Sequence, residues 1–281
     1  MLILALDTTS EMGGVGIFRD AECLALVPNS GPANQYAVRL FELVEQALAQ
    51  AQVRMGDIDL FAAANGPGSF TGIRVGLAAA RAWGKAFTRP VRGVSVLEAM
   101  VNSTCLATVS VLDAVVNSTP LATDWAFPIM DARRGEFFVE GFRKVGLAVE
   151  PGFSPATSES GPQCGPQHAA LKGGSTPLRE YEPADDGWIF RPDSLRGFIE
   201  EQLARGRTAT CVVQAHDQSA VALRAALPAS VEWRQIEGTL VNSIADIARK
   251  EEQTGVPCPP SKLDAFYIRR PDAEVKFGAG D

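Results

Sequence analysis

Hydrophobic and polar positions along the first 94 residues follow strand-like and helix-like periods in turn. Three short apolar runs separated by polar turns predict three strands, at residues 2–6, 15–18 and 21–27. Residues 33–51 carry a single apolar face at helical spacing, which predicts an amphipathic helix. Buried strands are predicted at residues 58–64 and 91–94, on either side of a second helix. This succession of strands and helices indicates an α/β fold.

The second helix, residues 71–87, has an unusual surface. On a helical wheel it carries two adjoining stripes of apolar or very small side chains, Ile73, Leu77, Ala80, Gly84 and Phe87 in one and Gly72, Gly76, Ala79, Trp83 and Ala86 in the other. Glycine costs about 1 kcal/mol per helical position relative to alanine, so its repeated use suggests that another chain segment approaches closely. The second stripe either contacts a partner helix or is buried within its own domain, and the wheel does not choose between them.

The turn that precedes this helix contains Gly66, Pro67, Gly68 and Ser69, which raises the possibility of a phosphate-binding loop. The spacing GxxxxGK[ST] is absent, Lys85 lies too far along the helix, and Pro67 lacks an N–H. We therefore predict a structural turn that caps the helix through Ser69 or Thr71.

Two aspartates follow predicted strands and precede hairpin turns. Asp7, with Thr8 and Thr9 behind it, could hold a metal-bound phosphate as in actin-like ATPases, although a turn capped by these side chains is the simpler interpretation. Asp131 lies between predicted strands at 125–130 and 137–142. A second glycine-rich phosphate loop is missing after the strand predicted at 208–213, so these residues describe a nucleotide-binding type of scaffold without its chemistry.

The later part of the chain contains two unusual segments. Residues 95–108 are nearly repeated at residues 110–123, which indicates a local tandem duplication that lengthens a helix-loop segment. Residues 151–187 are rich in Gly, Pro and Ser and predict a long surface excursion. Further helices are predicted at residues 191–205, 219–226 and 240–253.

Composition excludes several classes of function. The net charge of −7 argues against unassisted binding of nucleic acid, and no apolar run approaches the length of about 20 residues that a membrane helix needs. Five widely spaced cysteines without a CxxC pair favour reduced thiols in a cytoplasm. The two histidines, His168 and His216, form no HExxH pair. We predict no catalytic residue, no bound metal and no cofactor.

Four segments in order, ILALDTTSEMGGVGIF, NGPGSFTGIRVGLAAARAWGKA, PIMDARRGEFF and DAFYIRRPDAE, resemble the TsaB (YeaZ) family. The resemblance spans nearly the whole chain and is weakest between residues 151 and 239. It implies two actin-like (ASKHA, ribonuclease H-like) α/β domains with mixed sheets flanked by helices. These would be residues 1–94 and residues 95–281, the latter with the duplicated insertion, the excursion and a C-terminal helix that could pack back on the first domain.

The resemblance also implies a function. Such proteins are non-catalytic subunits that pair with a TsaD-like catalytic subunit and act with a TsaE-like ATPase to place a threonylcarbamoyl group on adenosine 37 of tRNA. In isolation they form homodimers through the same surface, and they meet tRNA only through the complex, with no membrane involved. Relatives often carry a histidine where this chain has Gln35, which puts any role of that position in doubt.

Carried over to this chain, the resemblance gives two sets of residues. The partner interface would lie on the two helices of the first domain, at Tyr36, Leu40, Val44, Leu48, Gly72, Gly76, Ala79 and Trp83. A degenerate nucleotide site would comprise Asp7, Thr8, Thr9 and Asp131. The alternative is an ATP-dependent phosphotransferase or ATPase that uses Asp7 and Asp131 around magnesium.

Overall fold

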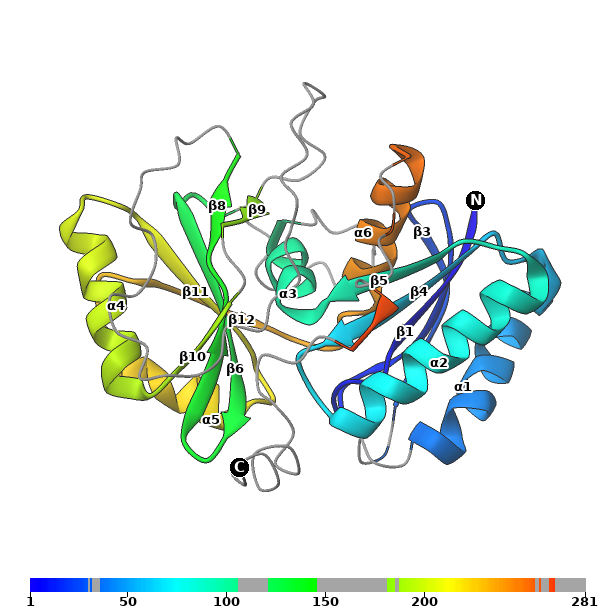
Figure 1. Ribbon diagram of the computed structural model, residues 1–281, viewed down its shortest axis with the longest axis horizontal. Helices are drawn as coiled ribbons and strands as arrows, with labels where there is room; N and C mark the ends of the chain where they lie inside the picture. Colours follow the sequence, from blue (N-terminus) through cyan, green and yellow to red (C-terminus); the bar gives the residue numbers. More distant parts are fainter. Residues whose placement is uncertain are drawn as a thin grey trace, which may run out of the picture.

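The computed structural model describes residues 1–29, 31, 36–105, 121–145, 181–184, 187–255, 258 and 263–265. Two sheets stand side by side with helices on their outer faces and between them (Figure 1). The predicted α/β class with mixed, helix-flanked sheets is confirmed. The second copy of the repeat up to residue 120, most of the excursion, Gln35, His168 and the tail after residue 265 lie outside the described residues. The domain boundary at residues 94 and 95 stays a prediction.

The first sheet has the strand order β3-β2-β1-β4-β5. Its strands are β1 (Leu2–Asp7), β2 (Gly14–Arg19), β3 (Glu22–Pro28), β4 (Leu60–Gly66) and β5 (Val91–Ser95). β1 pairs antiparallel with β2 and parallel with β4, so that Leu4 lies beside Ile17 and Phe61 on one face. Ile3 and its neighbours point to the other face. Both faces are covered, which explains why β1 is a continuous apolar run rather than an alternating one.

Helices α1 (Tyr36–Ala51) and α2 (Phe70–Phe87) cover the outer face of this sheet. The short helix η2 (Met55–Asp57) lies between α1 and β4, and β4 leads into α2. Helices α3 (Val96–Cys105) and α6 (Val241–Gln253) pack on the opposite face and against each other, between the two sheets (Figure 1). A cluster of buried side chains from both sheets and from α3 and α6 therefore forms the centre of the molecule.

The second sheet has the order β10-β7-β6-β11-β12, with β8 and β9 attached through β6. Its strands are β6 (Trp125–Arg133), β7 (Glu136–Val139), β8 (Phe142–Lys144), β9 (Tyr181–Pro183), β10 (Trp188–Phe190), β11 (Ala209–Gln214) and β12 (Glu232–Ile236). Helix α4 (Pro192–Ala204) with α5 (Gln218–Ala222) and η3 (Leu223–Ala226) packs on its outer face. None of the described helices combines the length and apolarity that a bilayer crossing requires.

One predicted strand, residues 137–142, is wrong as a single element. The chain forms β7 and β8, both paired with β6 in one continuous register that places Glu140 opposite Pro128. Proline has no N–H to donate to the ladder, which explains the interruption. Strands β9, β10 and β12 were not predicted. β9 and β10 are only three residues long, which is too short for a recognisable apolar pattern. β12 lies at the sheet edge and carries the polar residues Glu232, Arg234 and Gln235, which hide its strand pattern.

Candidate functional site: an apolar helix face beside a closed aspartate turn

The turn between β4 and α2 is fixed by contacts with the turn after β1. The backbone N–H of Ser69 donates to the carbonyl of Thr9 at 2.7 Å, and the Thr8 hydroxyl donates to the carbonyl of Gly72 at 2.7 Å. Gly68 has φ +154°, and a Cβ there would lie 2.7 Å from the Thr9 side chain, so only glycine fits. The peptide bond between Gly66 and Pro67 is cis. The turn thus positions the start of α2 beside the turn after β1.

Ser69 is the N-cap of α2. Its Oγ accepts a hydrogen bond of 3.2 Å from the N–H of Gly72, which satisfies one of the unpaired donors of the first turn. Thr71, the other candidate for this role, is exposed on the helix surface.

The glycines of α2 face the chain itself. A Cβ on Gly72 would lie 1.9 Å from the carbonyl oxygen of Thr8, and a Cβ on Gly76 would lie 2.4 Å from the hydroxyl oxygen of Thr8. Both glycines are buried. The prediction that they contact a partner is therefore wrong: they are small so that α2 can lie against the turn after β1.

Three predicted contact residues of α1 are also internal. Tyr36, Leu40 and Val44 are only 1–2% exposed and belong to the core between α1 and the first sheet. The apolar stripe of an amphipathic helix faces its own sheet, so these side chains cannot reach a partner, and their assignment to the interface is wrong. Leu48 on α1, with Ala79 and Trp83 on α2, is half-buried and packs on the same core.

A different set of apolar side chains is exposed on these helices. Val38 is 76% exposed and Phe41 60% exposed, and Phe41 makes an edge-to-face ring contact with Trp83 at 6.1 Å. On α2, the Arg74 guanidinium stacks over the exposed Phe70 ring at 3.5 Å. We use "α1–α2 face" for the exposed residues Val38, Phe41, Phe70, Ala78 and Ala82. Val38 and Phe41 lie outside the main apolar stripe of α1, and that departure from amphipathicity was the sequence signal for them.

The exposed large apolar side chains are unevenly distributed. Among the described residues they are Met12, Val38, Phe41, Phe70 and Phe87, all from the first sheet and its helices. Exposed large apolar side chains that gather on one part of a protein often mark a binding surface. The α1–α2 face is therefore the leading candidate for a functional surface.

The aspartate at the end of β1 is closed off. Asp7 is 1% exposed, and its Oδ1 accepts hydrogen bonds from the Thr9 N–H at 3.0 Å and the Thr9 hydroxyl at 2.7 Å. Its Oδ2 is buried and has no hydrogen-bond partner among the described residues. Burial raises the pKa of Asp7, and the Thr9 hydrogen bonds and the nearby His216 offset this only in part.

Asp131 occupies a matching place at the end of β6 but serves its own hairpin. Its Oδ1 accepts from the N–H of Arg133 at 2.7 Å, and its N–H donates to Oδ2 of Asp217 at 2.8 Å. Asp217 also caps α5 by accepting from the N–H of Ala220 at 2.9 Å. From the second half of the molecule, His216 lowers the pKa of Asp7 slightly.

These residues do not fit a magnesium-nucleotide site. A metal with bound phosphates needs carboxylate oxygens with open coordination positions, whereas Asp7 is buried and the Asp131 carboxylate accepts from its own turn. No group of three or more potential ligands comes together among the described residues. Burial also raises the pKa of Cys211 to about 12, which keeps it a neutral thiol rather than a nucleophile.

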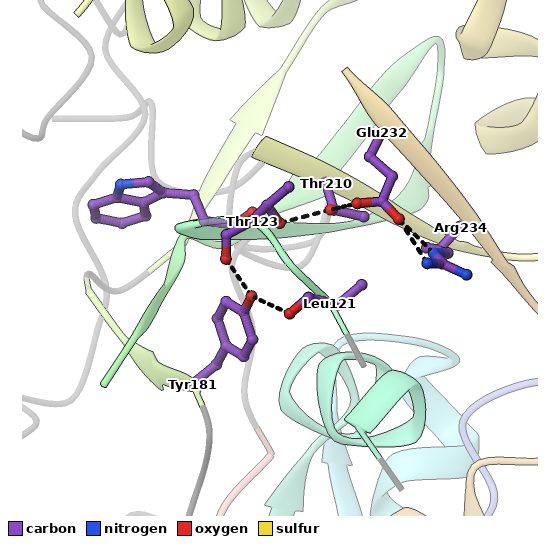
Figure 2. Close-up of polar contacts among 7 residues, drawn as sticks. Leu121, Thr123, Tyr181, Thr210, Glu232 and Arg234 are labelled. Atoms are coloured by element: carbon purple, nitrogen blue, oxygen red, sulfur yellow. Dashed lines mark hydrogen bonds and ion pairs between the residues drawn. The ribbon is translucent and has the colours of Figure 1, made fainter. Parts of the chain in front are cut away.

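The second sheet holds a buried polar network at the opposite ends of its parallel strands (Figure 2). The hydroxyls of Thr123 and Thr210 are hydrogen-bonded to each other at 2.7 Å, and Thr210 is bonded at 3.0 Å to Glu232, which is paired with Arg234 at 2.7 Å. The Tyr181 hydroxyl donates to the Thr123 carbonyl. Ligands of open α/β sheets bind at the carboxyl ends of strands, so this network at the amino ends joins β6, β9, β11 and β12 structurally.

Comparison with known proteins places this geometry in a family. The family model of TsaD, tRNA N6-adenosine threonylcarbamoyltransferase, matches residues 27–151. An uncharacterised protein of Mycobacterium tuberculosis is 35% identical over 180 residues, which cover 60% of this chain and 74% of that protein. The Escherichia coli tRNA threonylcarbamoyladenosine biosynthesis protein TsaB is 33% identical over 103 residues, or 36% of this chain and 42% of that protein. The structure of YeaZ from Pseudomonas aeruginosa superposes with a TM-score of 0.62 at 17% identity, over 95% of this chain and 99% of that chain.

The chain belongs to the TsaB (YeaZ) family. The resemblance seen in the four sequence segments is thereby confirmed. The part matched by the TsaD model includes α1, α2 and the turn between β4 and α2.

Proposed function

We propose that this protein is an accessory subunit in the synthesis of tRNA N6-threonylcarbamoyladenosine, without a catalytic site of its own. Membership of the TsaB family supports the pathway, since curated relatives carry that function in their names. The buried Asp7 supports the accessory role, because its carboxylate is enclosed, and Asp131 Oδ1 accepts a hydrogen bond from its own turn.

The α1–α2 face is the surface through which it binds, and this face is the observation that carries the proposal. Its partner is a TsaD-like catalytic subunit. Because the TsaD family model matches this region, such a subunit would present an equivalent pair of helices, and the two pairs would meet about a pseudo-two-fold axis. The same geometry permits two copies of this chain to pair through Val38 and Phe41 when the partner is absent.

The proposed binding surface is tested by placing a charged side chain on the α1–α2 face. Val38→Glu changes a side chain that is 76% exposed, so the fold is expected to be retained. A charge at the centre of an apolar contact leaves a desolvated carboxylate without a partner, and we expect the affinity for the TsaD-like subunit to fall by about 30-fold or more. Titration calorimetry measures the affinity, and the yield of modified tRNA in a reconstituted reaction measures the consequence.

Gln50→Glu is the matched control. Gln50 is exposed on α1, on the side of the helix away from Phe41, and the change adds the same charge. The control is expected to bind and support modification normally. Equal binding by Val38→Glu and Gln50→Glu would contradict the proposed surface, and a failure of the unaltered chain to bind would contradict the proposed partner.

The accessory role has a separate test. The isolated chain is expected to show no micromolar affinity for ATP by calorimetry, because the Asp7 carboxylate is enclosed. Micromolar binding that disappears in Asp7→Ala would overturn the accessory role in favour of an ATP-dependent enzyme.

A further inference from the structure

A groove on α2 is lined on one side by a segment from the far end of the chain. Leu263, Asp264 and Ala265 face Arg74, Leu77, Ala78 and Arg81 across this groove. Ala265 packs against the core under α1 and α2, and the Asp264 carboxylate pairs with the Arg81 guanidinium at 3.4 Å. The short segment is drawn in red in Figure 1.

The segment has changed faces of the first sheet to reach this place. Helix α6 lies between the two sheets, on the inner face, and Arg92 of β5 pairs with Glu252 at its end. Leu263 lies on the outer side, with α2. The chain between Gly255 and Leu263 therefore connects the inner face to the outer one. The ion pair between Arg81 and Asp264 is exposed and contributes little, so the apolar contacts of Ala265 and Leu263 hold the segment.

This contact borders the α1–α2 face. Ala78 belongs both to the groove and to the face, and Arg74 lines the groove while it stacks over Phe70 of the face. Residues 266–281 continue from Ala265, and sixteen residues of extended chain reach at most about 55 Å. Helix α2, with 18 residues, is about 27 Å long. The remaining chain is therefore long enough to cover the whole face.

The composition of this segment complements the face. Phe266, Tyr267 and Ile268 directly follow the anchored residues and match its apolar character. Arg269 and Arg270 come next, and Glu42 and Glu45 are exposed on α1 beside Val38 and Phe41. An apolar run followed by a basic pair thus corresponds to an apolar surface that carries carboxylates on its α1 side, whereas the basic side chains of α2 lie on the side of the anchored segment.

We propose that residues 263–281 form an intramolecular strap that covers the α1–α2 face and competes with the protein partner for it. The identity of that partner rests on the proposed function, but the covering of the face does not. The strap keeps the apolar face from pairing indiscriminately, and a partner binds by displacing it.

The covering is tested in the full-length chain without any partner. A cysteine reporter at Ala82→Cys lies on the face, and a second at Ser194→Cys lies on the exposed side of α4. Each is combined with Phe266→Ser, Tyr267→Ser and Ile268→Ser, which remove the apolar part of the strap. Alkylation of each reporter by a maleimide is followed by mass spectrometry of its peptide. The Ala82 reporter is expected to react at least three-fold faster in the altered strap, and the Ser194 reporter at an unchanged rate.

The competition is tested with the same strap variants. Their affinity for the TsaD-like subunit, or for a second copy of the chain, is expected to rise about ten-fold. Ala265→Asp releases the anchor by another route and is expected to act in the same direction, which guards against a misfolded triple variant. An unchanged Ala82 rate in both variants would overturn the strap. Faster labelling with weaker binding would also overturn it, because the segment would then be part of the partner contact. Faster labelling with no binding by any form would contradict the proposed partner and support the strap.

Discussion

The two halves of this molecule share the same order of strands and helices but differ in the side chains that their outer helices expose. The strand orders β3-β2-β1-β4-β5 and β10-β7-β6-β11-β12 correspond position by position, with α1 matching α4 and α2 matching α5 with η3. The outer helices of the first half expose Val38, Phe41 and Phe70. On α4 the exposed side chains form ion pairs one turn apart, Arg196 with Glu200 and Arg205 with Glu201. A shared scaffold therefore exposes apolar side chains on the outer helices of one half and ion-paired side chains on α4 of the other.

The aspartate turns make the same comparison inside the molecule. In the first half the turn after β1 bonds to the start of α2 through Thr8 and Thr9, and in the second half Asp131 bonds to Asp217 at the start of α5. In both halves a turn after a central strand is thus joined by hydrogen bonds to the start of an outer helix.

The largest effect is expected from Gly72→Ala. The added Cβ would lie 1.9 Å from the carbonyl oxygen of Thr8, and backbone cannot move aside as a flexible side chain can. We expect a loss of about 3 kcal/mol or more in the free energy of unfolding, at the upper end of overpacking effects. Denaturant titration measures it. A stable, fully folded Gly72→Ala protein would show that α2 does not need its close approach to β1.

The same reasoning applies to Gly76→Leu, which would otherwise suggest itself as a test of pairing through the second stripe of α2. Because a Cβ at Gly76 would meet the Thr8 hydroxyl at 2.4 Å, it is expected to destabilise the fold itself, so it cannot serve as a test of pairing.

The next effect concerns pH and Asp7. Its pKa is raised in the folded state by burial, so the folded protein holds this proton more tightly than the unfolded chain does. The stabilisation is complete below the unfolded pKa of 3.8 and is lost as pH rises through the folded pKa. Relative to Asp7→Asn, the unaltered protein should lose at most about 1.4 kcal/mol per pH unit in this window. Unfolding titrations of both proteins at several pH values measure the difference.

Asp246 on α6 supplies the control of opposite sign. Burial raises its pKa, but the hydrogen-bonded ion pairs with Lys250 and Arg249 outweigh burial and the pKa is lowered overall. Its contribution is therefore present above the unfolded pKa and is lost as pH falls. If Asp7→Asn and Asp246→Asn shifted the pH profile in the same direction, the account of Asp7 would be refuted.

A smaller effect is expected from removing the two helix caps. Ser69→Ala deletes one hydrogen bond to the start of α2 and should cost about 1 kcal/mol. Asp217→Ala deletes the cap of α5 together with the acceptor of the Asp131 N–H, and should cost about 2 kcal/mol. Thermal unfolding of both variants compares them. Equal costs would mean that the link between Asp131 and Asp217 adds nothing to the cap.

The smallest effect is a gain, expected from Gly197→Ala on α4. Apart from the neighbouring backbone of α4, no atom of the described residues lies within 4 Å of a Cβ built at Gly197, and the residue is exposed within the helix. Alanine should stabilise the protein by about 0.5–1 kcal/mol through its helix propensity. This change is the counterpart of Gly72→Ala, measured by the same denaturant titration. A loss of stability here would mean that the glycine of α4, like that of α2, serves a contact.

Much of this molecule follows from local sequence patterns. The apolar run of β1, the amphipathic period of α1 and the cap at Ser69 depend on residues close together in the chain, and the sequence determined the α/β class and the four segments that resemble the TsaB family. Strands β9, β10 and β12 could not be predicted because they are short or polar. They are held in place by pairing with neighbouring strands.

The direction in which each helix stripe points was decided only by the tertiary structure. A helical wheel shows that Gly72 and Gly76 share a stripe but not that the turn at Thr8 fills the space beside it. The wheel also assigns Tyr36 and Leu40 to an apolar face without saying that this face is the core, which leaves Val38 and Phe41 outside. The physical reason is that a stripe is defined relative to its own helix, whereas a surface is defined by what the rest of the chain covers.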